Sequence, residues 1–181
     1  NRHVAWGFTN SYGDWLDFYR VQWTDAAHSR YRSAQGEQTL KIVHEKILVK
    51  GKPAEDFVIR ETIWGPITEE LGADTSLALR WAAQQPGAIN LGLARLATAA
   101  NIDDALARAG DIGMPAQNMV MGDASGRIAW RLSAQMPNRV GDCDMQAPVN
   151  PLAGCDWLGW RPASANPSLV DPPSGRLWTA N

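Results

Sequence analysis

Histidine and cysteine are scarce in this chain, which has three His and two Cys in 181 residues. The histidines, His3, His28 and His44, lie far apart, and none has a second metal-binding side chain at a ligand spacing. Two cysteines without a paired histidine do not favour a zinc site. The Gly-x-Ser-x-Gly, Walker and dinucleotide-binding patterns are also absent. The residues therefore offer no complete metal centre or catalytic triad.

Basic clusters and long apolar runs are lacking as well. The formal net charge is −2 with scattered Lys and Arg, which makes nucleic acid a poor candidate partner. No apolar run approaches the ~18 residues that suggest a membrane span. The length suits one domain, so we interpret residues 1–181 as a single domain. Because neither an initiator Met nor a signal-peptide pattern is present, we expect a piece of a longer chain or a processed product.

Tryptophan is abundant, with nine Trp against three Tyr and three Phe. Several tryptophans stand beside Gly, Asp or Pro, which favours packing anchors for irregular loops. The alternative is a β-rich binding or structural module whose Trp-rich loops recognise a ligand such as a glycan. Cys143 and Cys155 lie twelve residues apart in a loop-like stretch. They form either a disulfide, which would imply an oxidising compartment, or two free thiols.

The first half of the chain has the pattern of β-structure. Residues 39–49 alternate between apolar and polar side chains, 50–53 have turn residues, and 56–64 return, which predicts a long antiparallel hairpin. Shorter strands are predicted where β-branched and aromatic residues gather. They cover residues 4–8, 18–23 and 77–81.

The second half mixes helices, a hairpin and a long irregular stretch. Apolar spacings of three and four predict helices near 91–97 and 102–109, the second capped by Asn101. A turn at 123–126 predicts a hairpin of 118–122 with 127–131. Residues 137–173 show no periodicity, and 175–181 resemble the start of a strand. The order of elements predicts an α+β domain with mostly antiparallel sheet.

Asp14 and Asp17 form the one acidic pair with a suggestive spacing. Two carboxylates three residues apart just past a turn can converge on one hard cation, and the carbonyl of Leu16 adds an oxygen between them. Acidic pairs in loops are more often simply solvated. The spacing alone therefore indicates a metal site only weakly.

Six segments in the same order resemble the penicillin acylase family, whose members are amidases of the N-terminal-nucleophile hydrolase superfamily. They span nearly the whole chain, and in this sequence they read NRHVAWGFTN (1–10) with Asp14 and Asp17, ETIWGPI (61–67), GDASGRIAW (122–130), PNR (137–139), DWLG (156–159) and SGRLWTAN (174–181). Trp64 departs from the pattern, because the family usually has His there. The resemblance implies a partial αββα sandwich.

The resemblance also implies site residues. The oxyanion hole of the family falls on the backbone N–H of Asn10 and the side-chain amide of Asn181. Its calcium site falls on Asp14, the Leu16 carbonyl and Asp17, with a more distant carbonyl near Asp144. Calcium is therefore expected in the intact enzyme, and retention by these residues alone is doubtful.

The nucleophile of the family is a serine that autoproteolysis frees at the start of the β chain. By alignment it would precede Asn1, so we interpret the chain as an internal β-chain fragment that is inactive alone. Its expected partners are an amide substrate, the α chain and the remainder of the β chain; a homodimer covering open sheet edges is possible. The resemblance implies a periplasmic or secreted protein. Penicillins, homoserine lactones and other amides stay equally open as substrates, and so does a catalytically silent homologue.

Overall fold

The chain forms two compact units in the computed structural model, which describes residues 1–141, 143–144 and 146–179. Unit 1 consists of Asn1–Trp15, Ala82–Asn138 and Leu158–Asn181, and unit 2 of Leu16–Trp81 and Arg139–Trp157. The interpretation as a single domain stays a prediction. Within the described ranges, no helix has both the length and the apolar character needed to cross a membrane.

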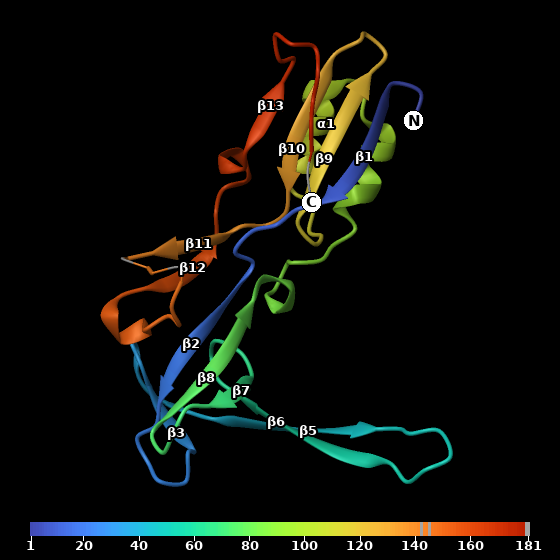
Figure 1. Ribbon diagram of the computed structural model, residues 1–181. Helices are drawn as coiled ribbons and strands as arrows, with labels where there is room; N and C mark the ends of the chain where they lie inside the picture. The colour runs from blue at the N-terminus through green and yellow to red at the C-terminus, as the bar shows by residue number, and fades with distance from the viewer. Residues whose placement is uncertain (142, 145, 180–181) are drawn as a thin grey trace. The chain divides into compact units, whose positions relative to one another are not determined.

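Unit 1 is built on a four-stranded antiparallel sheet, ordered β1-β9-β10-β13 (Figure 1). Its strands are β1 (Val4–Asn10), β9 (Gln117–Asp123), β10 (Ile128–Ser133) and β13 (Ser168–Val170). The hairpin predicted around 123–126 is confirmed as β9 and β10. The helical segments are η1 (Ala82–Gln84), η2 (Gly92–Thr98), α1 (Ile102–Ala109) and η4 (Ala163–Ala165).

The core of unit 1 lies between one face of this sheet and the helical segments η2 and α1. Met119 and Met121 of β9 point to this side and pack with Leu96 and Ile102, all at most 2% exposed. Since side chains alternate across a strand, Asn118 and its even-numbered neighbours point to the opposite face. The predicted helical spacing is confirmed, although residues 92–98 form a 3₁₀ helix.

The start of α1 is tied to the β9–β10 turn. The predicted cap is confirmed, because the side chain of Asn101 accepts a hydrogen bond from the N–H of Asp104 at 2.9 Å. Asp123 accepts from the N–H of Ile102 at 3.1 Å and, through its other oxygen, from Ser125 and the N–H of Arg127. These bonds, led by that of the Ser125 hydroxyl, lower the pKa of Asp123 to about 2.

The Asp123→Asn substitution is expected to lower the melting temperature at neutral pH and to matter less in acid. A carboxyl group with a depressed folded-state pKa contributes stability above its unfolded pKa of 3.8, and loses it as pH falls toward 2. Melting curves of both proteins between pH 6 and pH 2 check this. Curves that stay separated by the same interval throughout would contradict it.

Unit 2 contains a three-stranded antiparallel sheet, ordered β2-β8-β7, and two hairpins. The sheet strands are β2 (Leu16–Gln22), β7 (Ile67–Glu70) and β8 (Thr75–Trp81). The hairpins are β3 (Arg30–Ser33) with β4 (Gly36–Thr39), and β5 (Lys41–Ile47) with β6 (Glu55–Glu61). β11 (Pro137–Val140) and β12 (Asp156–Trp160), whose residues are divided between the two units, pair with each other. The short helix η3 (Pro151–Ala153) belongs to unit 2.

The predicted long hairpin is confirmed as β5 and β6, with Lys41 opposite Glu61. Its connection is longer than the four predicted turn residues, since the strands end at Ile47 and resume at Glu55. Most of its side chains are exposed on both faces, including Phe57 and Val58. The alternation of apolar and polar residues therefore predicts the pairing of the two strands correctly, although neither face of the hairpin is fully buried.

Stacked aromatic rings form the core of unit 2. Trp64 lies with its ring centroid 5.3 Å from Tyr19 and 5.5 Å from Tyr31, and Trp23 contacts the edge of Tyr31. Trp23, Trp64 and Trp157 are at most 9% exposed, which confirms the packing role for these three, whereas Trp178 is 74% exposed. The predicted α+β fold with mostly antiparallel sheet is confirmed. The strand predicted from 175 does not form over the described residues 175–179, and 180–181 lie outside them.

Candidate functional site

Asn10, the predicted backbone donor, is the last residue of the edge strand β1. The N–H of Ala124 donates to the carbonyl of His3 at 2.9 Å. His3 and Ala124 continue the β1–β9 register beyond Val4 and Asp123, so they are a hydrogen-bonded pair of that ladder. Such pairs alternate with unbonded ones in antiparallel sheets. The ladder bonds therefore fall at Thr9, opposite Asn118, and the N–H of Asn10 points away from β9.

The chain leaves β1 through the loop of residues 11–15, which contains Asp14. The loop is closed by the N–H of Trp15, which donates to the carbonyl of Gly13 at 3.0 Å, and the Trp15 indole donates to the carbonyl of Ser11 at 3.4 Å. Asp14 is exposed. Asp14 belongs to unit 1 and the other predicted metal ligands to unit 2.

Asp17 lies near the start of β2 with its side chain only 11% exposed. One of its oxygens, Oδ2, accepts a hydrogen bond from Nε of Arg139 at 2.9 Å and another from the indole N–H of Trp157. The guanidinium of Arg139 also lies 5.0 Å from the Trp157 ring. This predicted metal ligand is thus already paired with a cation, which leaves Oδ1 as its second oxygen.

The predicted ligands Leu16 and Asp144 lie in different surroundings. The N–H of Val149 donates to the carbonyl of Phe18 at 2.7 Å, so this carbonyl points away from β8. Carbonyls two residues apart in a strand point the same way, and the Leu16 carbonyl therefore also points away from β8. Asp144 is exposed, and its carboxylate accepts from the N–H of Gln146 at 2.9 Å. In the described part of the chain, no three His, Cys, Asp or Glu side chains gather as a metal cluster.

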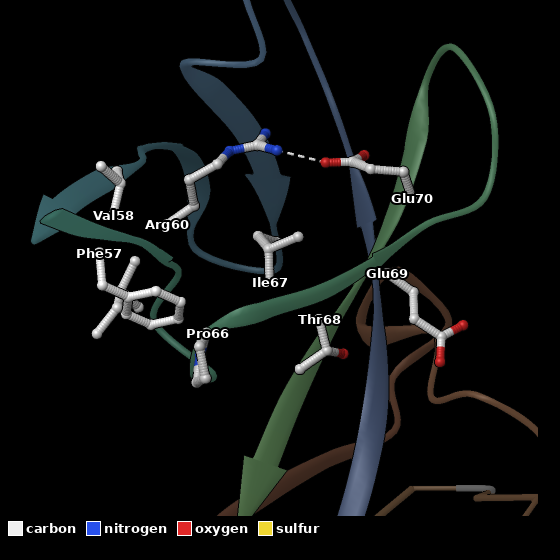
Figure 2. A pocket seen from close by; sticks show the side chains of 9 residues that line it. Phe57, Val58, Arg60, Pro66, Ile67, Thr68, Glu69 and Glu70 are labelled. Atoms are coloured by element: carbon white, nitrogen blue, oxygen red, sulfur yellow. Dashed lines mark hydrogen bonds and ion pairs between the residues drawn. The ribbon is translucent and has the colours of Figure 1, made fainter. Parts of the chain in front are cut away.

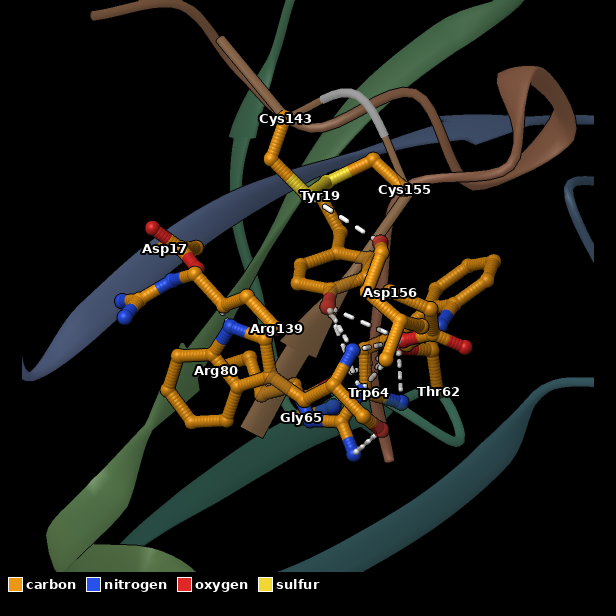
Figure 3. A network of polar contacts seen from close by, with 12 residues as sticks. Asp17, Tyr19, Thr62, Trp64, Gly65, Arg80, Arg139, Cys143, Cys155 and Asp156 are labelled. Atoms are coloured by element: carbon orange, nitrogen blue, oxygen red, sulfur yellow. Dashed lines mark hydrogen bonds and ion pairs between the residues drawn. A yellow bond between two sulfur atoms is a disulfide. The ribbon is translucent and has the colours of Figure 1, made fainter. Parts of the chain in front are cut away.

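A partly buried polar network lies beside Asp17 in unit 2 (Figure 3). Arg80 pairs with Asp156 at 2.6 Å, and the Tyr19 hydroxyl donates to the same carboxylate oxygen at 3.0 Å. The guanidinium groups of Arg80 and Arg139 lie 5.1 and 5.0 Å from the Trp157 ring. Burial raises the pKa of Tyr19, so its hydroxyl stays protonated and able to donate.

Cys143 and Cys155 form a disulfide beside this network, with Cα atoms 5.1 Å apart. Of the two alternatives left open by the sequence, the bonded one is confirmed. The disulfide closes the loop that contains Asp144 and ends directly before Asp156.

Known proteins similar to this chain identify its family. The sequence model of the penicillin amidase family matches residues 1–181. The chain belongs to the penicillin amidase family. It is 28% identical to a penicillin acylase 2 proenzyme of Pseudomonas sp. (strain SE83), over all of this chain and 24% of that protein. It is 27% identical to the acyl-homoserine lactone acylase QuiP of Pseudomonas fluorescens Pf-5, again over all of this chain and 23% of that protein.

The solved structures include a thermostable penicillin G acylase from Alcaligenes faecalis, similar with a TM-score of 0.86. The identity is 24%, and the match covers all of this chain and 33% of that chain. This likeness confirms the predicted fold. The chain spans about a quarter of the length of the curated relatives it matches.

Residues of the family motifs have clear structural roles in this chain. Asp123 holds the β9–β10 turn and the start of α1, Arg139 pairs with Asp17, and Asp156 pairs with Arg80. Trp64, at the position where the family usually has His, is 3% exposed within the aromatic core. Asn181, the predicted side-chain donor, lies outside the described residues.

The sequence reasoning missed Asn118, which contacts the end of β1. The residue is 8% exposed, and its side chain donates to the carbonyl of Asn10 at 2.9 Å. The signal that could have found it is a polar residue in an apolar strand, directly opposite the Thr9–Asn10 segment in the register of β1 and β9.

A cavity of about 450 Å³ lies between β6 and β7 in unit 2 (Figure 2). Phe57, Val58, Pro66 and Ile67 supply its apolar lining, and an ion pair of Arg60 with Glu70 crosses one side. Among the predicted site residues that the structure describes, Asn10, Asp14, Leu16, Asp17 and Asp144, none belongs to its lining.

Proposed function

We propose that this chain is part of an amidase and contributes to its oxyanion hole. The proposed reaction is hydrolysis of a linear or cyclic amide, by attack of an N-terminal serine supplied by a part of the precursor outside these residues. The family membership supports the reaction class, because its curated relatives are named as acylases. On this proposal the 181 residues alone have no activity.

The orientation of the Asn10 N–H is the observation that carries the proposal. An oxyanion donor must not be used by the protein's own hydrogen bonds, and it must be held in place before the reaction. The β1–β9 ladder does not use this N–H, and the end of β1 is held by Asn118. A strand end at the sheet edge meets both requirements.

In the proposed mechanism, the serine hydroxyl oxygen bonds to the amide carbonyl carbon while the serine α-amino group takes its proton. The carbonyl oxygen becomes negatively charged and accepts hydrogen bonds from the Asn10 N–H and the Asn181 side-chain amide. Collapse breaks the C–N bond and the amine leaves with a proton. Water then hydrolyses the acyl-serine ester and restores the hydroxyl group.

Calcium is proposed as a structural ion of the whole enzyme. Its ligands in this chain would be Asp14, the Leu16 carbonyl, Asp17 and Asp144, all hard oxygen donors of the kind calcium prefers. The edge-facing Leu16 carbonyl supports this, and Oδ1 of Asp17 is the oxygen that Arg139 and Trp157 leave. When bound, the ion would link chain segments without taking part in bond cleavage.

A periplasmic or secreted location is proposed as well. The disulfide between Cys143 and Cys155 supports it, since structural disulfides persist in oxidising compartments. The substrate class is proposed only as N-acyl compounds, because the curated relatives include enzymes named for penicillins and for acyl-homoserine lactones. The α chain, the remaining β chain and a homodimer stay predicted partners.

The test compares the processed full-length protein with the 181-residue chain on a panel of N-acyl amides that includes penicillins and acyl-homoserine lactones. We expect amide turnover by the full-length protein and none by the chain alone. Release of the amine, followed by mass spectrometry, measures the reaction. A full-length protein that processes itself but cleaves no amide, or an isolated chain that cleaves one, would show the proposal to be wrong.

A further inference from the structure

Asn118 is a buried polar residue on a central strand of the unit 1 sheet. It lies on β9, on the face opposite the helices, with 8% of its surface exposed. We propose that Asn118 is a positioning residue of the oxyanion hole, which holds the Thr9–Asn10 peptide so that the Asn10 N–H keeps its direction. This inference rests on the proposed function.

The contacts of Asn118 lie on both sides of that peptide. Its Nδ2 donates to the hydroxyl Oγ1 of Thr9 at 3.3 Å and to the carbonyl of Asn10 at 2.9 Å. The Asn10 N–H belongs to the peptide bond between these two residues. A single amide group therefore holds the residue before the donor and the carbonyl after it.

The orientation of the Asn118 amide is fixed by Trp130 on β10. The indole N–H of Trp130 donates to Oδ1 of Asn118 at 3.0 Å. An indole nitrogen can only donate, so the oxygen of the amide must face β10 and the nitrogen must face β1. The direction of the Asn118–Asn10 bond is thus set by the sheet itself.

The position of Asn10 explains why such a residue is needed. Asn10 is the last residue of an edge strand, and the β1–β9 ladder holds its N–H only through the Thr9 carbonyl of the same peptide. The Asn10 carbonyl has no ladder partner on the β9 backbone, and the Asn118 side chain supplies its hydrogen bond instead. Hydrogen bonds of a largely buried amide are stronger than those in water. Misplacement of a reacting group by about 1 Å can lower a rate about 100-fold.

The test uses Asn118→Asp in the processed full-length enzyme. The substitution keeps the shape but replaces the donor that faces Asn10 with a carboxylate. We expect kcat for amide hydrolysis to fall about 10- to 100-fold, with KM nearly unchanged. Because a protonated carboxyl group can donate again, the kcat ratio of variant to wild type should rise as pH is lowered.

Asn166→Asp is the matched control. Asn166 is 7% exposed and donates to the carbonyls of Leu132 and Ala134 at 3.2 and 2.8 Å, so the control removes a comparable buried amide away from β1. It should lower the melting temperature and leave kcat close to the wild-type value. Equal kcat values for the Asn118→Asp and Asn166→Asp enzymes, corrected for folded fraction, would overturn the inference.

Trp130→Phe decides the question if Asn118→Asp prevents folding or processing. It keeps an aromatic ring, although a smaller one, and removes the indole N–H that orients the amide. We expect a several-fold loss of kcat without a change in KM. An unchanged kcat would count against the inference. Failure of the proposed function is distinguishable, because the wild-type enzyme would then cleave no amide, whereas failure of this inference leaves an active wild type and an unaffected variant.

Discussion

The Asn10→Pro variant of the processed full-length enzyme is expected to lose about 10²–10³-fold in kcat for amide hydrolysis. Proline has no backbone N–H, so the substitution removes the proposed oxyanion donor directly. Proline is tolerated on edge strands where the N–H faces away from the neighbouring strand, which is the orientation of Asn10. The residue before it, Thr9, is already in the extended conformation that a following proline requires.

Asn10→Ala separates the main chain from the side chain. It keeps the N–H and removes only an exposed contact, in which the Gln117 side chain donates to Oδ1 of Asn10 at 3.2 Å. Exposed substitutions of this kind change free energies by about 0.5 kcal/mol or less, so most of the kcat should remain. Steady-state kinetics on one N-acyl amide measure both variants. If proline and alanine have the same effect, the backbone of Asn10 is not the donor.

The second large effect is expected from Arg139→Met, on stability. Arg139 and Asp17 form an ion pair whose side chains are 17% and 11% exposed. Removing one partner of a buried pair leaves an uncompensated charge, which costs ~3–5 kcal/mol. Trp157 loses a cation over its ring in the same change. Amides of β2 and β8 should therefore lose protection in native-state hydrogen exchange.

Arg30→Met is the control for the loss of an ion pair as such. Arg30 and Glu37 are also in unit 2 and 3.0 Å apart, but their side chains are 52% and 46% exposed. Exposed pairs contribute only up to about 1 kcal/mol, so protection should hardly change. If Arg139→Met had as small an effect as Arg30→Met, the Asp17 pair would be no stability determinant. Adding Asp17→Asn to Arg139→Met should restore part of the lost protection.

The local elements of the fold were predictable because their signals are local. The hairpin of β9 and β10 follows from turn residues between two apolar runs, and the helix α1 from apolar spacing after an N-cap. Asn101 carries its own signal, since a short polar side chain before an apolar-periodic stretch satisfies a free N–H of the first turn.

The connections between distant segments were not predictable in this way. Asp17 and Arg139 are 122 residues apart, and Tyr19 and Asp156 are 137 apart, so no spacing in the sequence relates them. The metal ion predicted from the acidic pair Asp14 and Asp17 stays a prediction. The cation that the structure provides for Asp17 is a guanidinium.

The residues of the candidate site were likewise not predictable from local signals. Asn10 and Asn181 came from the family resemblance alone, because a backbone donor leaves no trace in the identity of its side chain. Asn118 is recognisable in the sequence only as a polar residue in an apolar strand, because its role depends on the register of β1 against β9 and on the indole of Trp130. Both the register and the indole contact arise only when the strands pair in the folded protein.

The path of the chain limits how the molecule can be dissected. Unit 2 is formed by two separate stretches of the chain, residues 16–81 and 139–157. Each stretch contains one residue of the Asp17–Arg139 pair and one residue of the Arg80–Asp156 pair. A gene cut to either stretch would encode two of these four charged residues, each without its partner. Replacement of only one stretch would separate each of these residues from its own partner, so an exchange of unit 2 that keeps both pairs needs two linked replacements.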